Sequence, residues 1–467
     1  MTMKKLLSVA LVLAMFACAE IPEIVPPPIE DDESTKLSDL SSNEDQFKVP
    51  ADRETARVEV LSRGRGFYKD VFMDGGCYLT SRTSLPATDY LGISLEYFAS
   101  AENSKLTKTD TLIQHKIFTG SEEDTNGWLL YPDGAPRYRM IYVNGGKAAS
   151  HLKSMEMSSR ENLCKFVEAG GGYIGTCAGA FIASSGILYS SGKVDHAETY
   201  LGLYPGYVYS TGLNQDRTNL RFKEDSPLLR YYSFGNNREL YNLRHNGGCS
   251  AKDEDLATIP NAEALSHYVR PDKKNIDGRI NAWSYKADEN SGRVISCGSH
   301  PEGITSGKHL QYMAAMILYA MDGNPVPQPK GELYANEVRE MNKRTEDNDP
   351  AFTRIGDGQY HHFAIDVPSS CNRAIVTLEG YAGEDSFDLI LCGKSGELAY
   401  VDNTDHKTDA IACNAQLVIN EPNSGRWYVS VFCETTVESA IGQYGTEYTG
   451  RTDVLNGVPY KIAVKFE

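Results

Sequence analysis

The stretch Gly171-Gly172-Tyr173-Ile174-Gly175-Thr176-Cys177-Ala178-Gly179-Ala180 decides the fold of the main part of this chain. Its first glycines end a helical pattern over residues 161–169, and Tyr173-Ile174-Gly175 predicts a very short strand. Residues 178–186 then predict a helix of small residues. A strand that turns sharply into a helix at Gly-Thr-Cys-Ala-Gly matches the cysteine form of the nucleophile elbow, in which the turn lifts the nucleophile above a sheet.

Cys177 stands at the turn itself, where its surroundings favour a reactive thiol. The start of a helix stabilises negative charge and so favours the thiolate. The backbone N–H of Ala178 would point to the place where an oxyanion forms. Small neighbours are needed because the turn brings backbone close to a strained residue. The alternative interpretation is structural, since glycine and alanine also gather around a cysteine where a helix packs on a strand.

A second segment, Gly298-Ser299-His300-Pro301-Glu302, follows a strand predicted over Arg293–Cys297. A thiol nucleophile in acyl transfer needs a base that takes and returns its proton, and that base needs a carboxylate that orients it. His300 supplies the base and Glu302 the carboxylate, and one turn stiffened by a proline presents both. The sequence therefore predicts a Cys177–His300–Glu302 triad.

Two more glycine segments are expected at the same cleft. The predicted strand Ile141-Tyr142-Val143 leads into Asn144-Gly145-Gly146, where the lack of side chains lets backbone approach a substrate. Further along the chain, Asn246-Gly247-Gly248 precedes Cys249. For both segments a tight turn without a catalytic role is the alternative interpretation.

Together these segments resemble the class I glutamine amidotransferases, whose triad is an elbow cysteine followed far downstream by His-Pro-Glu. Within that superfamily the chain most resembles the domain at the N-terminus of some biotin-protein ligases, over most of residues 135–325. The resemblance implies that Gly145 or Gly146 donates a backbone N–H to the oxyanion hole. Asn144 stands where the superfamily has proline, a departure from its pattern. The sequence shows no ligase or synthetase segment, so the resemblance implies neither a biotin reaction nor strict amidotransfer.

The fold predicted for residues 52–325 is α/β, a flavodoxin-like parallel sheet of the class I glutamine amidotransferase type with helices on both faces. Strands are expected at Arg57–Val60, which would supply the first strand, and at Met140–Val143. A helix is expected at His309–Met321. Active sites of such sheets lie at the carboxyl ends of the strands, where the loops gather.

The N-terminus predicts export. Two lysines precede an apolar run from Leu6 to Ala17, which is too short to span a bilayer and is typical of a signal peptide. We expect residues 1–18 to be a lipoprotein signal with Cys18 as the lipidated residue, and residues 19–51 to be a disordered tether. The chain would then be anchored by lipid in a bacterial cell envelope. Cleavage by ordinary signal peptidase near Cys18 is the alternative, and it would release a secreted soluble protein.

Composition limits the partners and cofactors. The chain has 467 residues and a net charge of −17, which argues against a nucleic-acid partner. It has ten cysteines, so nine remain when Cys18 belongs to the signal, and this odd number leaves at least one free thiol or an intermolecular pair. We predict no cofactor and no structural zinc, because the histidines are scattered without ligand spacing, at His115, His151, His196, His245 and His267.

The last part of the chain has a different pattern. Residues 326–350 are expected to be a linker that starts with a proline-rich spacer and contains a polar helix at Glu332–Arg344. Residues 351–467 alternate with period two, which predicts a β-sandwich. Its strands are expected at His362–Val367, Ala374–Leu378, Phe387–Leu391, Trp427–Val431 and Tyr460–Val464. Asp385 and Asp388 are expected to be solvated, with calcium binding as the less favoured alternative.

This sandwich resembles the pre-peptidase C-terminal domain of secreted bacterial hydrolases, on the residues His362-Phe363, Asp385-Ser386-Phe387-Asp388-Leu389 and Gly425-Arg426-Trp427-Tyr428-Val429. The resemblance implies an accessory module without catalytic residues. Four cysteines in it allow up to two disulfides by three pairings, namely Cys371, Cys392, Cys413 and Cys433.

The leading functional hypothesis is an exported cysteine hydrolase that cuts a C–N bond of a small amide or peptide, still unidentified, through a thioester on Cys177. The first alternative is a non-catalytic binding or scaffold protein on the cell surface that keeps the same fold. An acyltransferase differs only in what attacks the thioester, so the sequence does not separate it from a hydrolase.

Overall fold

The computed structural model describes residues 51–74, 82–98, 126–155, 157–189, 191–195, 200–383, 387–408, 413–442 and 445–467. The expected signal peptide, its lipidated Cys18 and nearly all of the expected tether lie outside these ranges. So do His115, His196, Asp385 and Ser386, which are named above, and Cys77, one of the ten cysteines.

The main sheet is mixed, not wholly parallel as predicted. Its eleven strands run in the order β21-β22-β2-β1-β3-β4-β13-β12-β11-β8-β9. The parallel centre consists of β2 (Leu95–Phe98), β1 (Lys69–Asp74), β3 (Tyr138–Val143), β4 (Gly172–Thr176) and β13 (Val294–Cys297). Antiparallel strands extend it on both sides, namely β12 (Ile280–Tyr285), β11 (Ala262–Val269), β8 (Asp216–Arg221), β9 (Glu239–His245), β22 (Gly445–Thr449) and β21 (Glu438–Gly442).

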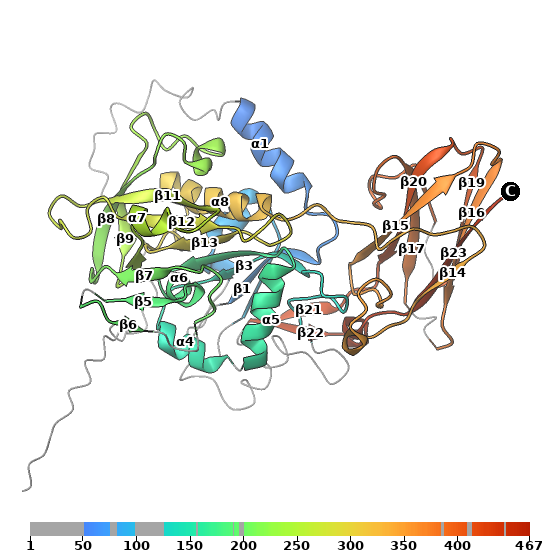
Figure 1. Cartoon of the computed structure of the whole chain (residues 1–467), viewed down its shortest axis with the longest axis horizontal. Coiled ribbons are helices and arrows are strands. Elements are labelled where there is room, and N and C mark those ends of the chain that lie inside the picture. Colours follow the sequence, from blue (N-terminus) through green and yellow to red (C-terminus); the bar gives the residue numbers. More distant parts are fainter. Residues whose placement is uncertain are drawn as a thin grey trace, which may run out of the picture. The chain divides into compact units, whose positions relative to one another are not determined.

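Helices cover both faces of the parallel centre (Figure 1). On one side lie α1 (Ala51–Ser62), α2 (Pro86–Leu91) and α8 (Gly307–Asp322), and on the other lie α4 (Ala148–Ser154), α5 (Met157–Glu168) and α6 (Ala178–Ala183). The sequence of β3 explains this arrangement, because successive side chains of a strand point to opposite faces. Met140 and Tyr142 pack in the core that contains α8, whereas Ile141 and Val143 pack with Leu163 and Phe166 of α5. The helix predicted at His309–Met321 is confirmed within α8.

The strand predicted at Arg57–Val60 is wrong, because these residues belong to α1. Ala56 and Val60 are buried four residues apart, while Val58 is 59% exposed. A strand would have placed Val58 and Val60 on the same face, so the burial pattern is helical. The first strand of the sheet is β1 instead.

A small second sheet lies next to the elbow helix, in the order β10-β7-β5-β6. Its strands are β10 (Cys249–Ser250), β7 (Tyr207–Ser210), β5 (Gly186–Leu188) and β6 (Val194–Asp195). Helix α6 is shorter than predicted because the chain leaves it at Ser184 and enters β5 at Gly186. The remaining short helices are α7 (Asp253–Leu256), η3 (Arg82–Ser84), η4 (Pro227–Arg230), η5 (Thr345–Asp347) and η6 (Thr452–Asn456).

The C-terminal part contains two four-stranded antiparallel sheets that share one apolar core. One sheet has β14 (Val338–Met341), β23 (Tyr460–Phe466), β16 (Arg373–Gly380) and β19 (Ala415–Asn420). The other has β15 (Tyr360–Val367), β20 (Gly425–Cys433), β17 (Leu389–Ser395) and β18 (His406–Lys407). Alternate residues of β15 face the core, as the period of two predicts, namely Phe363, Ile365 and Val367.

The polar helix predicted at Glu332–Arg344 is wrong. Val338–Met341 forms strand β14, which pairs with β23. The backbone upstream is also tied to the sandwich, since the amide of Leu333 donates to Ala364 O at 2.9 Å and that of Asn336 to Val464 O at 2.8 Å. These hydrogen bonds to β15 and β23 take the place of the hydrogen bonds that a helix would form within itself. This part of the expected linker therefore belongs to the sandwich.

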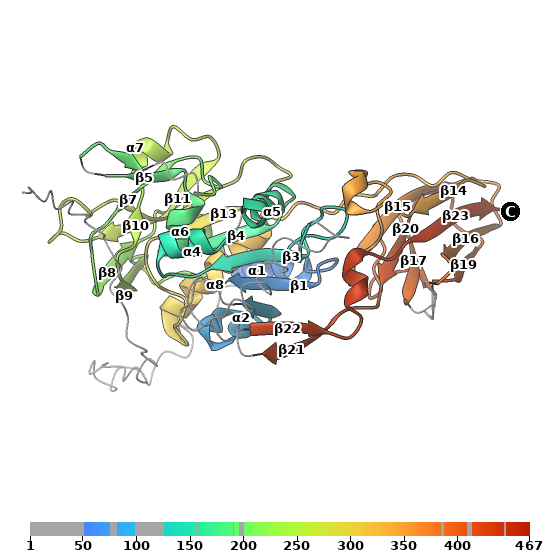
Figure 2. The same cartoon turned by 90° about the horizontal axis from the view of Figure 1, so that it is seen from below.

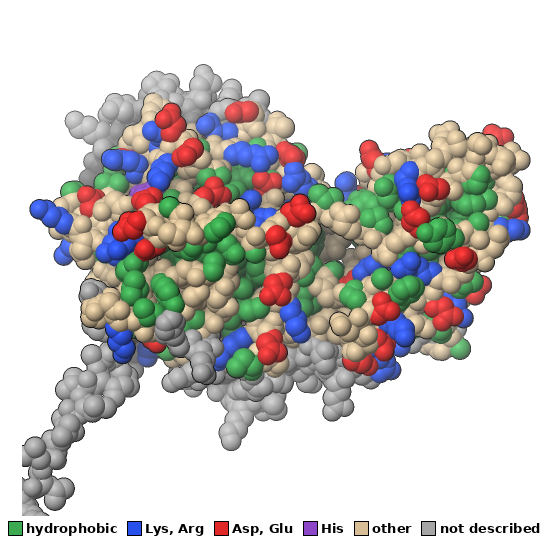
Figure 3. Space-filling model, viewed as in Figure 1, with side chains coloured by type: hydrophobic (Ala, Val, Ile, Leu, Met, Phe, Trp, Pro, Cys, Tyr) green, Lys and Arg blue, Asp and Glu red, His purple; other side chains and the backbone are tan. Residues whose placement is uncertain are grey.

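The two parts of residues 48–467 form one compact unit joined by buried contacts. Strand β22 pairs with β2 of the main sheet, with Gly445 opposite Phe98, and Figure 2 labels both strands of the β21–β22 hairpin. Arg137 of the segment before β3 binds Asp357 of the sandwich with two hydrogen bonds of 2.9 and 2.6 Å, and both side chains are 1% exposed. On the face shown in Figure 3, basic and acidic side chains are intermixed.

The disulfides expected in the sandwich are not formed. The eight cysteines that the structure describes are all thiols. Cys392 packs in a small cluster apart from the sandwich core that holds Cys413 and Cys433. The Cys413 thiol donates to Phe387 O and the Cys433 thiol to Thr435 O, each at 3.4 Å.

Candidate active site

Cys177 occupies a strained turn between β4 and α6. Its φ of 46° and ψ of −102° lie where residues with a side chain are rarely found. Such a conformation costs about 1–3 kcal/mol and persists only when its surroundings hold it. Its amide donates to Cys297 O at 2.8 Å, and its carbonyl accepts from the amide of Phe181 at 3.1 Å. These two bonds anchor the turn to β13 on one side and to α6 on the other.

Close packing explains the two glycines of the elbow. A Cβ on Gly175 would lie 2.3 Å from the carbonyl carbon of Gly179, and a Cβ on Gly179 would lie 2.2 Å from Val143 O. Both contacts are with backbone, which has little freedom to move aside. The glycine pattern is therefore required by the approach of α6 to β4 and β3, which is what a nucleophile elbow needs.

His300 and Glu302 lie on the loop that follows β13. His300 Nδ1 is 2.8 Å from Glu302 Oε1, so the carboxylate orients the imidazole. The amide of His300 donates to Arg244 O at 2.9 Å, which ties this loop to the end of β9. Both side chains are largely buried, at 13% and 18% exposed.

Gly145 brings the thiol and the imidazole together. A Cβ on Gly145 would lie 2.5 Å from His300 Cε1, 3.0 Å from His300 Nδ1 and 3.3 Å from Cys177 Cβ. All three distances start from the same point. Cys177 Cβ and His300 Cε1 therefore lie no farther apart than the 2.5 Å and 3.3 Å distances added together. Three segments that are far apart in sequence therefore meet at the carboxyl ends of β3, β4 and β13, as the triad prediction requires.

The thiol has a different hydrogen bond from the one expected. Cys177 Sγ donates to Asn246 O at 3.4 Å. Nε2 of His300 is buried, and no described residue forms a hydrogen bond with it. The thiol–imidazole hydrogen bond stays a prediction.

The Asn144-Gly145-Gly146 turn directly follows β3. The φ of Gly146 is 151°, which favours glycine. Oδ1 of Asn144 is buried, with no hydrogen-bond partner among the described residues, and the Asn144 amide lies 3.4 Å from Asp74 O. Convergence of the amides of Ala178 and of Gly145 or Gly146 on an oxyanion remains a prediction.

The Asn246-Gly247-Gly248 turn contacts the thiol and is held by two hydrogen bonds of its own. Gln215 N donates to Asn246 Oδ1 at 2.9 Å, and Gly247 N donates to Leu213 O at 2.6 Å. Oδ1 of Asn246 is thereby occupied, and its backbone carbonyl accepts from the Cys177 thiol. The turn contributes backbone to the surroundings of the thiol.

Two histidines that the sequence left without a role are placed near these turns. His151 of α4 lies 2.6 Å from Asp74 Oδ2, and both side chains are buried. Asp74 ends β1 and is paired in register with Val143, so this pair lies behind the Asn144 turn. His245 ends β9, directly before Asn246. Their positions in the sequence could have indicated this placement, because polar residues at strand ends next to glycine turns gather at one edge of the sheet.

Two other buried thiols in this part of the chain have raised pKa values. Burial raises the pKa of Cys297 to about 12 and also raises the pKa of Cys249. Those thiols stay protonated at neutral pH and are poor nucleophiles. Burial and then the carboxylate of Glu302 raise the pKa of Tyr142, whose hydroxyl lies 2.9 Å from Thr176 Oγ1. That tyrosine therefore stays neutral beneath the site.

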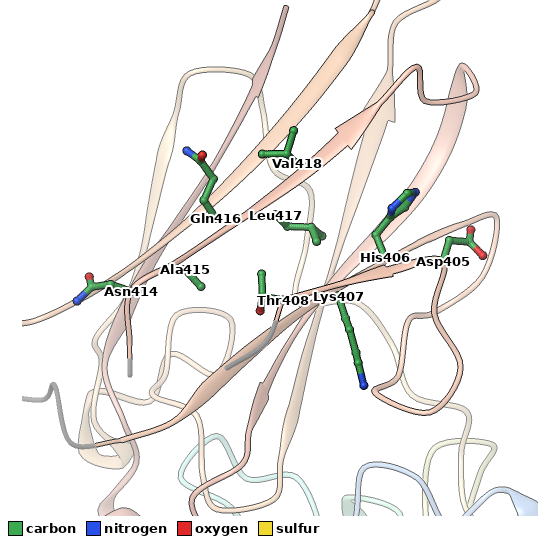
Figure 4. A pocket seen from close by; sticks show the side chains of 9 residues that line it. All are labelled: Asp405, His406, Lys407, Thr408, Asn414, Ala415, Gln416, Leu417 and Val418. Atoms are coloured by element: carbon green, nitrogen blue, oxygen red, sulfur yellow. The ribbon is translucent and has the colours of Figure 1, made fainter. Parts of the chain in front are cut away.

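Cys177 is 2% exposed. The hollow drawn in Figure 4 lies in the sandwich, between β18 and β19, and contains none of the triad residues. Among the residues that the structure describes, no group of three or more His, Cys, Asp or Glu side chains is arranged to hold a metal ion.

Comparison with known proteins identifies the part of the chain that holds the site. Residues 135–319 match the family model of the biotin-protein ligase N-terminal domain, which is related to the class I glutamine amidotransferase-like fold. The matched range contains Asn144, Cys177, Asn246, His300 and Glu302. No protein with a curated description matches the chain.

The similar solved structures have low TM-scores. A periplasmic inhibitor of g-type lysozyme from Aeromonas hydrophila, PliG, is 13% identical, with 23% of this chain and 77% of that chain covered and a TM-score of 0.15. A two-domain esterase active on acetylated mannans is 8% identical, with 89% and 95% covered and a TM-score of 0.18. At these TM-scores the likenesses establish neither a shared fold nor a shared activity.

Proposed function

We propose that this chain is a cysteine hydrolase that cuts an amide or peptide C–N bond with Cys177, His300 and Glu302. One observation carries the proposal: Gly145 lies against both the His300 ring and Cys177 Cβ, while Glu302 binds Nδ1 of the same ring. The match of residues 135–319 to a family related to the class I glutamine amidotransferase-like fold supports it. In the finer proposal, the parallel centre of the main sheet is the flavodoxin-like core of that superfamily.

The proposed reaction starts when Cys177 Sγ turns from Asn246 O and gives its proton to His300 Nε2. The thiolate attacks the carbonyl carbon of the substrate, and the oxyanion accepts hydrogen bonds from backbone amides of Ala178 and the Gly145–Gly146 turn. The C–N bond then breaks, and the leaving amine takes the proton from His300. Water next attacks the thioester, with His300 as base, and releases the acid and the thiol.

A binding or scaffold protein with the same fold is the second candidate. The observation that favours it is the state of the thiol, since Cys177 is 2% exposed and donates to a backbone carbonyl instead of to His300. The three triad residues would then have a structural role alone. The two candidates differ in one measurable property, the reactivity of the thiol.

The test is site-resolved alkylation of the full chain near neutral pH, followed by mass spectrometry of the peptide that contains Cys177. We expect Cys177 to be alkylated faster than Cys297 and Cys249, and Cys177→Ala to abolish turnover of an amide library. The matched control is Cys297→Ala, which removes a nearby buried thiol and should leave turnover intact. A Cys177 that reacts no faster than Cys297 would favour the scaffold.

We further propose that Cys18 carries a lipid that anchors the chain in a bacterial cell envelope, with release as a secreted soluble protein as the alternative. No helix in the described part of the chain has the length and apolar character needed to cross a membrane. The sandwich is proposed to be an accessory module of the pre-peptidase C-terminal type, on the sequence resemblance alone.

A further inference from the structure

His245 is a fully buried histidine whose two ring nitrogens both have partners. Its side chain lies at the end of β9, with the residue 0% exposed. Nε2 is 2.8 Å from Thr211 Oγ1, and Nδ1 is 3.1 Å from Ser299 Oγ. Ser299 directly precedes His300, so one side of the ring contacts the loop that carries the base.

The surrounding groups suit one neutral tautomer of this ring. The Thr211 hydroxyl donates to Gly248 O at 2.8 Å, which leaves its oxygen to accept from His245 Nε2–H. On the other side, Asn281 Nδ2 donates to Ser299 Oγ at 2.7 Å, so the Ser299 proton is available for His245 Nδ1. A neutral imidazole with its proton on Nε2 satisfies every group.

The charge state agrees with this assignment. Burial and then the neighbouring His300 lower the pKa of His245 to about 3, while Asp216 opposes them with a smaller effect and Arg270 adds the least. His245 is therefore neutral throughout the pH range in which a cysteine hydrolase would work. It serves as a fixed hydrogen-bonding bridge and does not exchange protons with the site.

The backbone on either side of His245 contacts the triad directly. Arg244 O accepts from the His300 amide at 2.9 Å, and Asn246 O accepts from the Cys177 thiol at 3.4 Å. The loops that follow are also in backbone contact, because a Cβ on Gly248 would lie 1.7 Å from Gly298 O. A shift of the His245 ring would thus move the acceptor of the thiol and the loop of the base together.

We propose that His245 is a positioning residue that sets the separation between the Cys177 thiol and the His300 imidazole by locking Ser299 to Thr211. This inference rests on the proposed function, since it concerns the same thiol and base. The His245 side chain contacts neither the substrate nor the thiol. It acts through Ser299 and the backbone of Asn246.

The same buried network offers a matched control at its far end. Ser266 Oγ is 3.3 Å from Asn281 Oδ1 and 2.9 Å from Tyr312 OH, and it is as buried as Ser299. Ser266→Ala therefore removes a buried hydroxyl of the network without touching either loop of the triad. A purely structural network would respond alike to Ser266→Ala and Ser299→Ala.

The experiment is the pH dependence of Cys177 alkylation by iodoacetamide in the full chain, measured on the Cys177 peptide. Ser299→Ala and His245→Leu should lower the rate constant at neutral pH roughly threefold to tenfold, the equivalent of about one hydrogen bond. They should also raise the midpoint of the profile, because a displaced imidazolium stabilises the thiolate less. His245→Gln keeps a donor and an acceptor and should recover part of the rate, and Ser266→Ala should match the wild type.

Two failures are distinguishable in these data. If His300→Ala changes the wild-type profile but Ser299→Ala and His245→Leu do not, the positioning role of His245 is overturned while the triad stands. If His300→Ala also leaves the profile unchanged, the proposed function is overturned, and the positioning role is overturned with it. Thermal unfolding of each variant identifies any that does not fold, and Ser299→Ala, the smallest change, then carries the test.

Discussion

Arg137→Met should destabilise the whole compact unit of residues 48–467, because it leaves a buried carboxylate without its partner. The guanidinium binds Asp357 with two hydrogen bonds, and both side chains are 1% exposed. It also lies over the Tyr68 ring, 3.8 Å from its centroid. Breaking a buried ion pair from one side costs about 3–5 kcal/mol, mostly because the remaining charge is desolvated.

The assay is equilibrium unfolding in urea, followed by the fluorescence of the chain's three tryptophans. We expect Arg137→Met to lower the free energy of unfolding by about 3–5 kcal/mol. Arg137→Met combined with Asp357→Leu should be less destabilised than Arg137→Met alone, since no unpaired charge remains. The matched control is Arg426→Met, which breaks exposed pairs with Glu332 at 2.9 Å and Asp366 at 3.2 Å and should destabilise the chain far less.

The same contacts bear on a chain shortened at the linker expected over residues 326–350. A proline-rich linker predicts that a chain ending near Pro329 folds alone and keeps its thiol. That truncation removes Asp357 and also Tyr448, whose hydroxyl binds the buried Glu96. We therefore expect the truncated chain to be poorly folded. A soluble, cooperatively folded truncation, or an Arg137→Met variant no less stable than Arg426→Met, would refute the reasoning.

Three further outcomes are expected. Gly145→Ala should abolish turnover while the fold survives, because the new methyl would lie 2.5 Å from His300 Cε1; circular dichroism with an activity assay checks this, and an active variant would contradict the site geometry. Acidification from pH 6.5 towards 4 should destabilise the protein, because burial lowers the pKa of His362 to about 3. In this range the unfolded chain binds a proton at this histidine that the folded chain does not bind. His362→Gln should therefore reduce the slope of the unfolding free energy against pH by about 1.4 kcal/mol per pH unit. Cys18→Ala should abolish fatty-acid labelling and free the chain from membranes, and a wild type already soluble after secretion would rule out the lipid anchor.

The sequence predicted the elements whose pattern is set by close packing. Gly175 and Gly179 are required because backbone atoms of α6, β4 and β3 nearly touch, and the glycine spacing records that contact. Residues 173–175 and 294–297 lie in adjacent parallel strands, which is why both loops that follow them reach the same edge. Local chemistry and local pattern agree in these segments, so little tertiary information was needed.

Other predictions failed where the same local pattern fits two structures. Val58 and Val60 suit a strand, but Val60 packs with Ala56 on a helix, and only the position of the sheet decides between them. Residues 332–344 are polar enough for a surface helix, yet the open edge of β23 offered hydrogen bonds to β14. In both cases a partner distant in sequence determined the outcome, and a single sequence does not reveal that partner.

The residues that hold the proposed triad in place could not be predicted from the sequence. His245 is isolated in sequence from the groups it contacts, which lie 34 and 54 residues away at Thr211 and Ser299. Its role depends on which atoms face it, and residue types at a fixed spacing do not encode that. A nucleophile and its base are recognisable because chemistry restricts their type, whereas a positioning residue can be any side chain with a suitable donor and acceptor. Sequence motifs therefore suffice to propose the reacting groups of this site, whereas the proposal of a residue that sets the distance between them needs the folded chain.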